Sequence, residues 1–266
     1  MYISHESPIS LLKRSRIYND YDYALVHLFE QSEEYYSFFR SSVLQLREVL
    51  LDNSIFELKK AFDPTKYADW IVKLQPTFYI MPDALECVDT TILKYESFRD
   101  NFARYLPKNI LRIGVVQGKT YNDLVDCYRF MSKNADYIAI TFDLSFYETS
   151  SYGSNKYELF KNGRINLIRN LIADNIWDWN KPHHLLGCSL PIEFKWYREN
   201  KITNIRSCDT SNPVMAGINK IKYSGDLGIN EKPKGLLADN LHAHLESEAI
   251  DLIEYNINCF RKIVNG

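Results

Sequence analysis

Eight short apolar segments, most of them separated by segments with helical patterning, limit most strongly what this chain can fold into. The apolar segments are residues 2–5, 23–29, 49–51, 77–81, 110–116, 136–142, 183–188 and 202–208. Helices are expected over residues 10–16, 33–47, 64–73, 94–105, 121–133, 164–176, 191–199 and 244–263. Alternation of strands and helices favours a parallel sheet, and a count of eight favours a closed barrel. The sequence therefore predicts an α/β fold, a single (β/α)8 TIM-like barrel over residues 1–266.

The competing arrangement is an open, doubly wound α/β sheet. No glycine-rich phosphate-binding turn follows an early strand, which disfavours that arrangement. No linker-like segment divides the 266 residues, although residues 143–162 and 216–240 have the composition of loops. A hydrophobic content of 45% and a charged content of 25% are ordinary for a soluble globular domain. With a net charge of -2, any binding of nucleic acid must depend on a local basic patch.

Cysteine usage and the N-terminal residues bear on where the protein works. The five cysteines form no Cys-x-x-Cys pair, which favours a reducing compartment without disulfides. The N-terminus lacks the pattern of a signal peptide, and no apolar run approaches the ~18 residues of a membrane span. His242 and His244 have the spacing of a metal pair, but no third ligand lies near them in the sequence. We expect a cytoplasmic protein with no membrane contact, no bound metal and no cofactor.

Polar side chains follow four of the expected strands directly. Asp52, Asp83, Gln117 and Asp209 each stand at the C-terminal end of a strand segment. In a barrel these ends share one mouth, where barrel enzymes carry their active sites. Three carboxylates in one mouth repel each other, so at least one should have a raised pKa and act as general acid or base. A single aspartate such as Asp209 could instead simply open an Asx-turn.

Five segments around these residues resemble, in their order and spacing, the signatures of one enzyme family. They are residues 50–54 (LLDNS), 81–86 (MPDALE), 115–124 (VVQGKTYNDL), 184–191 (HLLGCSLP) and 206–209 (RSCD). The family is the tRNA-guanine transglycosylase superfamily. The resemblance covers about residues 24–213, and its specificity lies in the order of the motifs because each motif alone is degenerate.

The resemblance implies a role for each matching residue. Asp209 would attack C1′ of the target nucleoside and expel guanine, which leaves a covalent glycosyl-enzyme. Asp52 would move protons on the leaving and incoming bases, while Asp83 and Gln117 would hold the base by its hydrogen-bonding edge. Further substrate-binding candidates are Gly118, Leu186, Gly187 and His27. For His27, at the end of the segment 23–29, a satisfied core histidine is an equally good interpretation.

The sequence also departs from the family pattern. The family's zinc site needs three clustered cysteines and a histidine after the nucleophile, but only Cys259 follows Cys208. The arginines that read the tRNA anticodon loop have no equivalent, since residues 210–219 contain no basic residue. These losses resemble the phage and bacterial branch that inserts 7-deazaguanine bases into DNA. The implied enzyme has a barrel without a zinc subdomain and exchanges guanine in DNA for a free, preQ0-like base, in the host cytoplasm if a phage encodes it.

Two other functions remain open at this point: a small transglycosylase that acts on tRNA, and a non-catalytic barrel that binds nucleic acid. The expected phosphate contacts are the basic residues around Tyr223, namely Lys220, Lys222, Lys232 and Lys234. An ordinary solvated loop would explain these lysines nearly as well. The sequence contains no feature that predicts the oligomeric state or the DNA sequence context.

Overall fold

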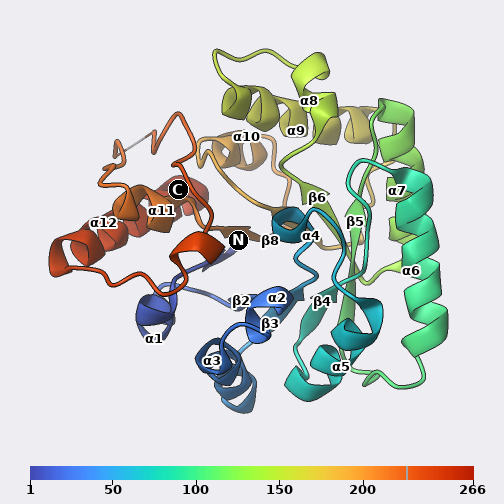
Figure 1. The fold of residues 1–266 in the computed structure, drawn as a ribbon. Helices are drawn as coiled ribbons and strands as arrows, with labels where there is room; N and C mark the ends of the chain where they lie inside the picture. Colours follow the sequence, from blue (N-terminus) through green and yellow to red (C-terminus); the bar gives the residue numbers. More distant parts are fainter. Residues whose placement is uncertain (226) are drawn as a thin grey trace.

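A parallel sheet of eight strands curls into a nearly closed barrel, with helices on its outside (Figure 1). The computed structural model describes residues 1–225 and 227–266. The strands are β1 (Tyr2–His5), β2 (Asp22–Leu25), β3 (Val49–Asp52), β4 (Phe78–Ile80), β5 (Leu111–Val116), β6 (Tyr137–Thr141), β7 (His183–Leu186) and β8 (Ile205–Thr210). Every neighbouring pair is parallel, in the order β1-β8-β7-β6-β5-β4-β3-β2. The predicted (β/α)8 barrel is confirmed.

The seam between β1 and β2 closes the barrel through side chains as well as backbone. Asp20, just before β2, donates its N–H to the carbonyl of Ile3 at 2.9 Å and accepts from the Ile3 N–H at 2.8 Å. The Tyr23 N–H donates to Ser4 Oγ at 3.2 Å. Polar side chains thus satisfy backbone groups that a continuous strand ladder would otherwise pair.

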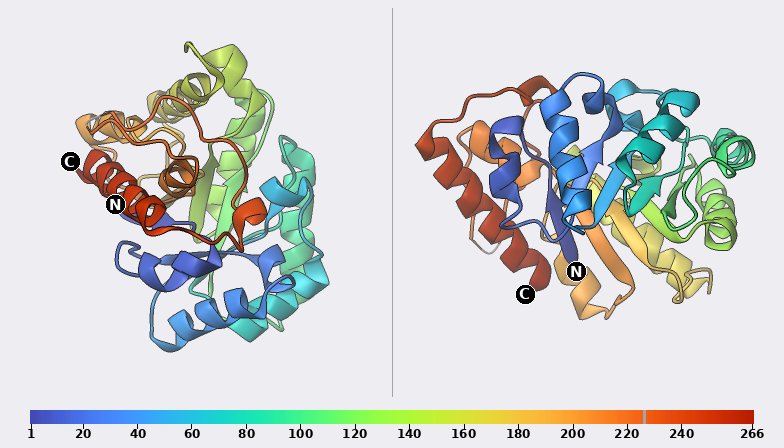
Figure 2. Two further views of the ribbon diagram at one scale, coloured as in Figure 1. Left: turned by 60° about the vertical axis from the view of Figure 1, so that its left-hand side comes forward. Right: turned by 90° about the horizontal axis from the view of Figure 1, so that it is seen from below.

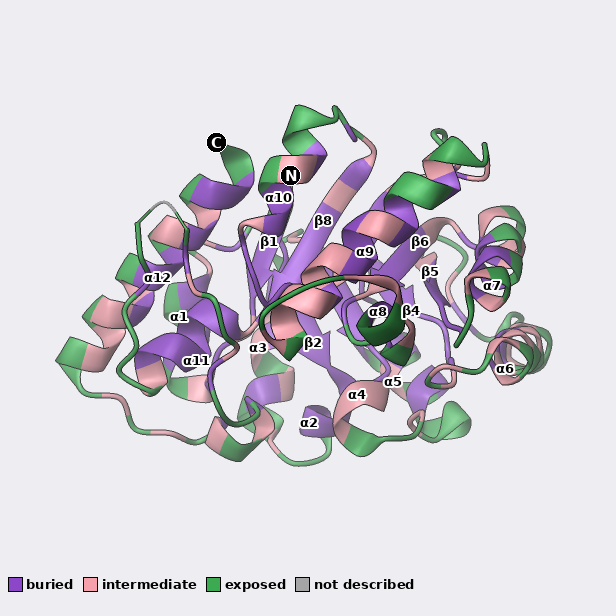
Figure 3. Ribbon diagram, turned by 90° about the horizontal axis from the view of Figure 1, so that it is seen from above, coloured by how far each residue is buried: buried purple, intermediate pink, exposed green. Residues whose placement is uncertain are grey.

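Helices follow the strands, and the longer ones cover the outer face of the sheet (Figure 1). The helices are α1 (Leu12–Ser15), α2 (Val26–Phe29), α3 (Glu33–Leu44), α4 (Ile55–Leu58), α5 (Pro64–Leu74), α6 (Val88–Phe102), α7 (Tyr121–Asn134), α8 (Ser145–Ser150), α9 (Lys156–Ala173), α10 (Glu193–Glu199), α11 (Asn212–Ile218) and α12 (Ser247–Asn265). Short 3-10 turns span Ile9–Leu11 and Ala238–Asn240. Buried strands fill the centre of the molecule, and the exposed residues lie on the outer faces of the helices (Figure 3). In both views of Figure 2 the chain ends lie side by side, where the Met1 amino group contacts Asn265 Oδ1 at 3.4 Å.

Three predicted boundaries are wrong by four residues or more. The expected strand 23–29 ends at Leu25, and its second half is the helix α2. Helix α6 begins at Val88 rather than at residue 94. The expected loop 143–162 contains α8 and the first turns of α9, which Asn155 caps by accepting from the N–H groups of Tyr157 and Glu158.

The segment from α11 to α12 is largely irregular, as predicted. Its residue 226 lies outside the described residues. A hydrogen-bonded bridge joins Ser224 and Gly228, and residues 235–238 reach the mouth of the barrel. Within the described ranges, no helix combines the length and apolar character needed to cross a membrane.

Candidate active site

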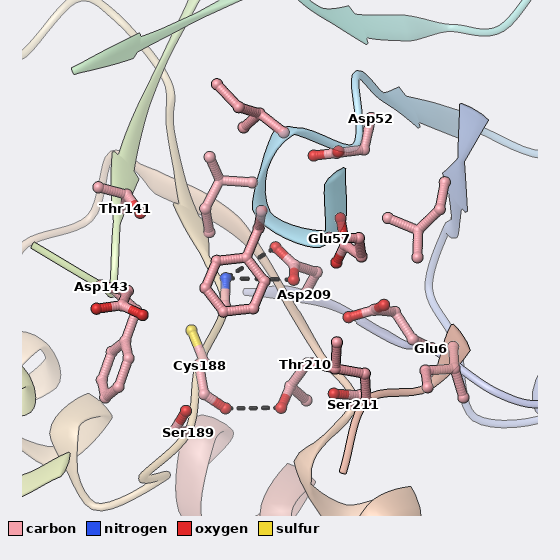
Figure 4. Close-up of a pocket in the computed structure, with 18 of the residues that line it drawn as sticks. Glu6, Asp52, Glu57, Thr141, Asp143, Cys188, Ser189, Asp209, Thr210 and Ser211 are labelled. Carbon is pink, nitrogen blue, oxygen red and sulfur yellow. Dashed lines mark hydrogen bonds between the residues drawn. The ribbon is translucent and has the colours of Figure 1, made fainter. Parts of the chain in front are cut away.

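A cavity of about 150 Å³ lies at the C-terminal mouth of the barrel (Figure 4). Residues at or just after the ends of all eight strands line it, together with α4, α9 and residues 235–238 of the long loop. Of the predicted substrate-contacting residues, six line the cavity: Asp52, Asp83, Gln117, Leu186, Gly187 and Asp209. The barrel therefore brings together the four strand-end side chains that the sequence singled out.

Asp209, in β8, is held by two hydrogen-bond donors from β7 and the turn after it. The Gly187 N–H lies 3.2 Å from each carboxylate oxygen, and His184 Nε2 lies 3.0 Å from Oδ1. Ser207 Oγ lies 2.9 Å from His184 Nδ1, so a proton on Nε2 lets the ring donate to Asp209 and accept from Ser207. These contacts fix the carboxylate's orientation at the cavity wall, where Asp209 is only 3% exposed.

A buried ion pair stabilises the turn that contains Gly187. Arg164 of α9 and Glu193 of α10 form a bidentate pair, with N···O distances of 2.7 and 2.8 Å, and both side chains are 0% exposed. Arg164 also donates to the Leu186 carbonyl at 2.9 Å and contacts Cys188 Sγ at 3.3 Å. Two helices are thus tied to the residues on either side of Gly187.

Asp52, at the end of β3, lies in the same cavity with both oxygens engaged. Tyr23 of β2 donates its O–H to Oδ2 at 2.5 Å, and the Ser54 N–H donates to Oδ1. Burial raises the pKa of Asp52 well above its usual range; Glu57 and Asp209 add to this, while Tyr23 and Ser54 oppose it. A carboxyl group with a raised pKa is suited to proton transfer.

Asp83 and Gln117 form a polar group with Asn53 on another part of the cavity wall. Asp83 Oδ1 accepts from Asn53 Nδ2 at 2.8 Å, and Oδ2 accepts from Gln117 Nε2 at 2.7 Å. Gln117 Oε1 in turn accepts from the Glu86 N–H at 3.0 Å. Burial raises the pKa of Asp83, although both amides counteract it. The group offers carboxyl and amide acceptors to the N–H edge of a heterocycle.

The cavity is strongly acidic. Its described lining includes the carboxyl groups of Glu6, Asp52, Glu57, Asp83, Asp143 and Asp209, and a single basic side chain, that of Lys232. Burial raises the pKa of Glu6 well above its usual range, and Asp209 and Glu57 raise it further. Burial is the largest cause at Glu6, Asp52 and Glu57, and the neighbouring carboxylates raise these pKa values further.

Several predicted residues lie outside the cavity lining. Gly118 sits where a Cβ would come within 2.7 Å of Asp123 Cβ, so it allows α7 to pack close to the end of β5. His27 is buried in α2, and its ring Nδ1 has no hydrogen-bond partner among the described residues. Lys220, Lys222 and Lys234 are exposed on the loop before α12.

Sequence reasoning missed Glu6, Glu57, His184, Tyr23 and Asn53. Glu6 follows β1 directly, so the same search of strand ends could have found it. Glu57 lies one helical turn beyond the end of β3, and Tyr23 and His184 lie within strands. For these three, only the packing of the barrel shows the contact. His183 and His184 point to opposite faces of β7, since His183 packs on Tyr128 of α7 and His184 contacts Asp209.

In the part of the chain that the structure describes, no group of three or more His, Cys, Asp or Glu side chains is arranged to hold a metal ion. His242 and His244 lie in the loop before α12, and His244 is 89% exposed. Cys208 lies in β8 and Cys259 in α12.

No protein-family model and no curated protein matches this chain.

Proposed function

We propose that this protein is a base-exchange glycosyltransferase that replaces guanine in DNA by a 7-deazaguanine, such as preQ0, through a covalent intermediate on Asp209. One observation carries the proposal. The Asp209 carboxylate is oriented by Gly187 and His184 at the wall of an acidic cavity, and the Asp83–Gln117 pair lines the same cavity. This arrangement offers a nucleophile and a base-recognition group to one small molecule.

The arrangement suits a double displacement. A carboxylate nucleophile splits glycosyl exchange into two substitutions at C1′, each with inversion, so that the product retains its configuration. Gly187 and His184 donate to Asp209 and keep it aligned for attack, and they also stabilise the carboxylate when it is released. The resemblance described above gives the proton transfers to Asp52.

Recognition of the base is the task proposed for Asp83 and Gln117. Guanine and 7-deazaguanine share an edge with an N–H and an amino group side by side, and a carboxyl acceptor suits that edge. Gln117 is buried to 1% exposure and its Nε2 already donates to Asp83, so its position is fixed before a base enters. Leu186 and Gly187 complete the adjacent wall. Such preorganisation favours selection of the base by shape and hydrogen bonds.

DNA is proposed as the polymer because residues 210–219, directly after Asp209, include no arginine or lysine to read an anticodon loop. A base in duplex DNA must leave the stack to enter the cavity, which costs a few kcal/mol. Lys232 at the cavity, with Lys220, Lys222 and Lys234 on the same loop, supplies the proposed phosphate contacts. Buried carboxyl groups with raised pKa values favour an enzyme over a passive binding barrel.

The experiment that tests the proposal incubates the protein with isotopically labelled guanine or preQ0 and either duplex DNA or tRNA, followed by nucleoside analysis. Label in DNA is expected, with far slower exchange into tRNA. Asp209→Ala should lower the rate by roughly 10⁴-fold or more. Efficient exchange into tRNA alone would favour a tRNA transglycosylase, and no exchange into either polymer would favour a non-catalytic barrel.

A further inference from the structure

Glu57 is the cavity carboxyl group to which the sequence motifs give no role. It lies in the short helix α4, which follows Asp52 at the end of β3, and it lines the cavity (Figure 4). In Figure 4 its carboxyl group lies beside Asp209, with Asp52 above it and Glu6 below it. Glu57 thus lines the same cavity as Asp209 and lies near enough to respond to the Asp209 charge.

Glu57 differs from Asp52 and Glu6, the other carboxyl groups on which the Asp209 charge acts, in the state of one oxygen. Its Oε2 atom is buried and has no hydrogen-bond partner among the described residues. A buried oxygen without a hydrogen-bond partner destabilises the fold, and such exceptions in a folded protein call for a reason. By contrast, both Asp52 oxygens already accept hydrogen bonds, from Tyr23 and from Ser54. A proton on Asp52 therefore competes with these two donors, whereas no donor competes for Glu57 Oε2 among the described residues.

The surroundings of Glu57 favour its protonated form at higher pH than for an exposed glutamate. Burial raises the pKa of Glu57, and the Asp209 charge adds to this effect. Its own backbone N–H, Lys232 and Lys59 oppose the rise. The titratable and charged groups around it come from six parts of the chain. They are Glu6 just after β1, Tyr35 of α3, Asp52 of β3, Lys59 just after α4, Asp209 of β8 and Lys232 of the long loop.

We propose that Glu57, rather than Asp52, carries the proton between the leaving and the incoming base, an inference that rests on the proposed function. In the first step an Asp209 oxygen bonds to C1′ as the C1′–N9 bond breaks. The bond's electron pair goes to guanine, and the Glu57 O–H protonates the departing base. In the second step the incoming base gives its N9 proton to the Glu57 carboxylate and bonds to C1′ through N9. The bond between C1′ and Asp209 breaks, and its electron pair restores the carboxylate.

A change of leaving group separates proton transfer from a structural role. Guanine needs a proton to depart, whereas 7-methylguanine carries a positive charge in the nucleoside and departs as a neutral base without one. Single-turnover release of both bases would be measured from otherwise identical DNA duplexes. Glu57→Gln should slow guanine release by about 10²- to 10⁴-fold, the usual contribution of general acid–base catalysis. Its release of 7-methylguanine should stay within a few-fold of the wild-type rate.

Two control variants and the pH dependence of guanine release complete the test. Glu199→Gln, at an exposed position in α10, should leave both rates unchanged, and Asp209→Ala should abolish both. Wild-type release of guanine should fall as the pH rises through the pKa of Glu57, because the acid form is needed. That fall should vanish in Glu57→Gln and with 7-methylguanine as the leaving base.

Three results would overturn the assignment: equal slowing of both bases in Glu57→Gln, no slowing of guanine release, or the selective pattern appearing in Asp52→Asn instead. A wild-type protein that releases neither base from DNA, nor guanine from tRNA, would refute the proposed function itself. That outcome is seen in the wild-type protein alone, so failure of the proposed function can be distinguished from failure of the Glu57 assignment.

Discussion

Glu57 and Asp52 show at the scale of single residues how a functional site opposes stability. Both carboxyl groups are held in a buried, acidic cavity, and neither forms an ion pair within the described residues. Because each folded-state pKa is raised, the native state binds these protons more tightly than the unfolded chain does. Stability is therefore fully present below the ordinary carboxyl pKa and declines as the pH rises through the folded-state values.

Glu57→Gln should accordingly stabilise the protein at neutral and higher pH. The amide keeps the shape of the side chain and removes the charge, so we expect a gain of about 0.5–2 kcal/mol, the usual size of a stabilising substitution. The gain should shrink toward about pH 4, where an exposed glutamate is itself protonated. Urea unfolding across this pH range, with Glu199→Gln as the exposed control, would measure it. A gain that does not change with pH would contradict this explanation.

The predictable part of the site at this scale is the set of polar residues at strand ends. Asp52, Asp83, Gln117 and Asp209 follow apolar segments, and the barrel geometry alone assigns them to one mouth. The partners of Asp209 could not be found in this way. His184 lies in the middle of a strand segment, and its contact with Asp209 depends on the register between β7 and β8.

At the scale of elements, the C-terminal end of β7 depends on the two helices on either side of it in the chain, α9 before it and α10 after it. Arg164 of α9 and Glu193 of α10 meet with no exposure to solvent, and Arg164 also binds the Leu186 carbonyl. Removal of one partner leaves the other charge buried and unpaired. The turn that carries Gly187, and with it the orientation of Asp209, relies on this pair.

Arg164→Met should therefore lower the free energy of unfolding by about 3–5 kcal/mol. The double variant Arg164→Met with Glu193→Met should recover much of the loss, since no charge is then stranded. The partly exposed pair of Arg112 and Asp136 is the control, and Arg112→Met should cost about 1 kcal/mol or less. If urea unfolding gave the same loss in free energy of unfolding for Arg164→Met and Arg112→Met, the buried pair would not stabilise the fold more than a partly exposed one.

The errors in element boundaries have physical causes. The run YALVHLF at residues 23–29 is apolar throughout, and a short apolar run fits a buried strand and a buried helix equally well. Helix α9 begins in a segment rich in Tyr, Ser and Gly, where the capping contacts of Asn155 decide the start. Long, periodic segments such as residues 121–133 were placed almost to the residue because their apolar face is unambiguous.

At the scale of the whole molecule, the strand count and the alternation with helices were enough to predict the barrel. The closure between β1 and β2 was not predictable, because it uses the side chains of Asp20 and Ser4 in addition to a backbone contact. The conformation of the long loop could not be predicted from the sequence either. Only the structure brings its residues 235–238 and Lys232 to the cavity.

The charge distribution over the whole molecule predicts which surface should bind a nucleic acid. The net charge is -2 and the cavity is acidic, so phosphate binding must come from a local group of cations. Arg14 and Arg16 are less suited to this role. Arg14 forms a salt bridge with Glu254, and Arg16 donates hydrogen bonds to the Phe38 carbonyl and to Ser42 Oγ. The lysines of the long loop remain as the proposed contacts.

Neutralising Lys220, Lys222, Lys232 and Lys234 to Gln should weaken DNA binding and flatten its salt dependence. Each lost phosphate contact should lower the slope of log K against log salt by about 0.9. Affinity for the free base should change little. Lys108→Gln is the control, because Lys108 is exposed before the start of β5, at the opposite end of the barrel. A slope that is unchanged in the quadruple variant would exclude this loop as the DNA-binding surface.

The central claim is that Asp209 forms a covalent bond to the sugar, and trapping that bond tests it most directly. The protein would be mixed with a guanine-containing DNA duplex in the absence of free base, quenched with acid, digested and examined by mass spectrometry. We predict a deoxyribosyl-DNA adduct on the peptide that contains Asp209, its loss on addition of guanine, and its absence from Asp209→Ala. Guanine release without an adduct, or an adduct on another residue, would contradict the assignment of Asp209 as the nucleophile.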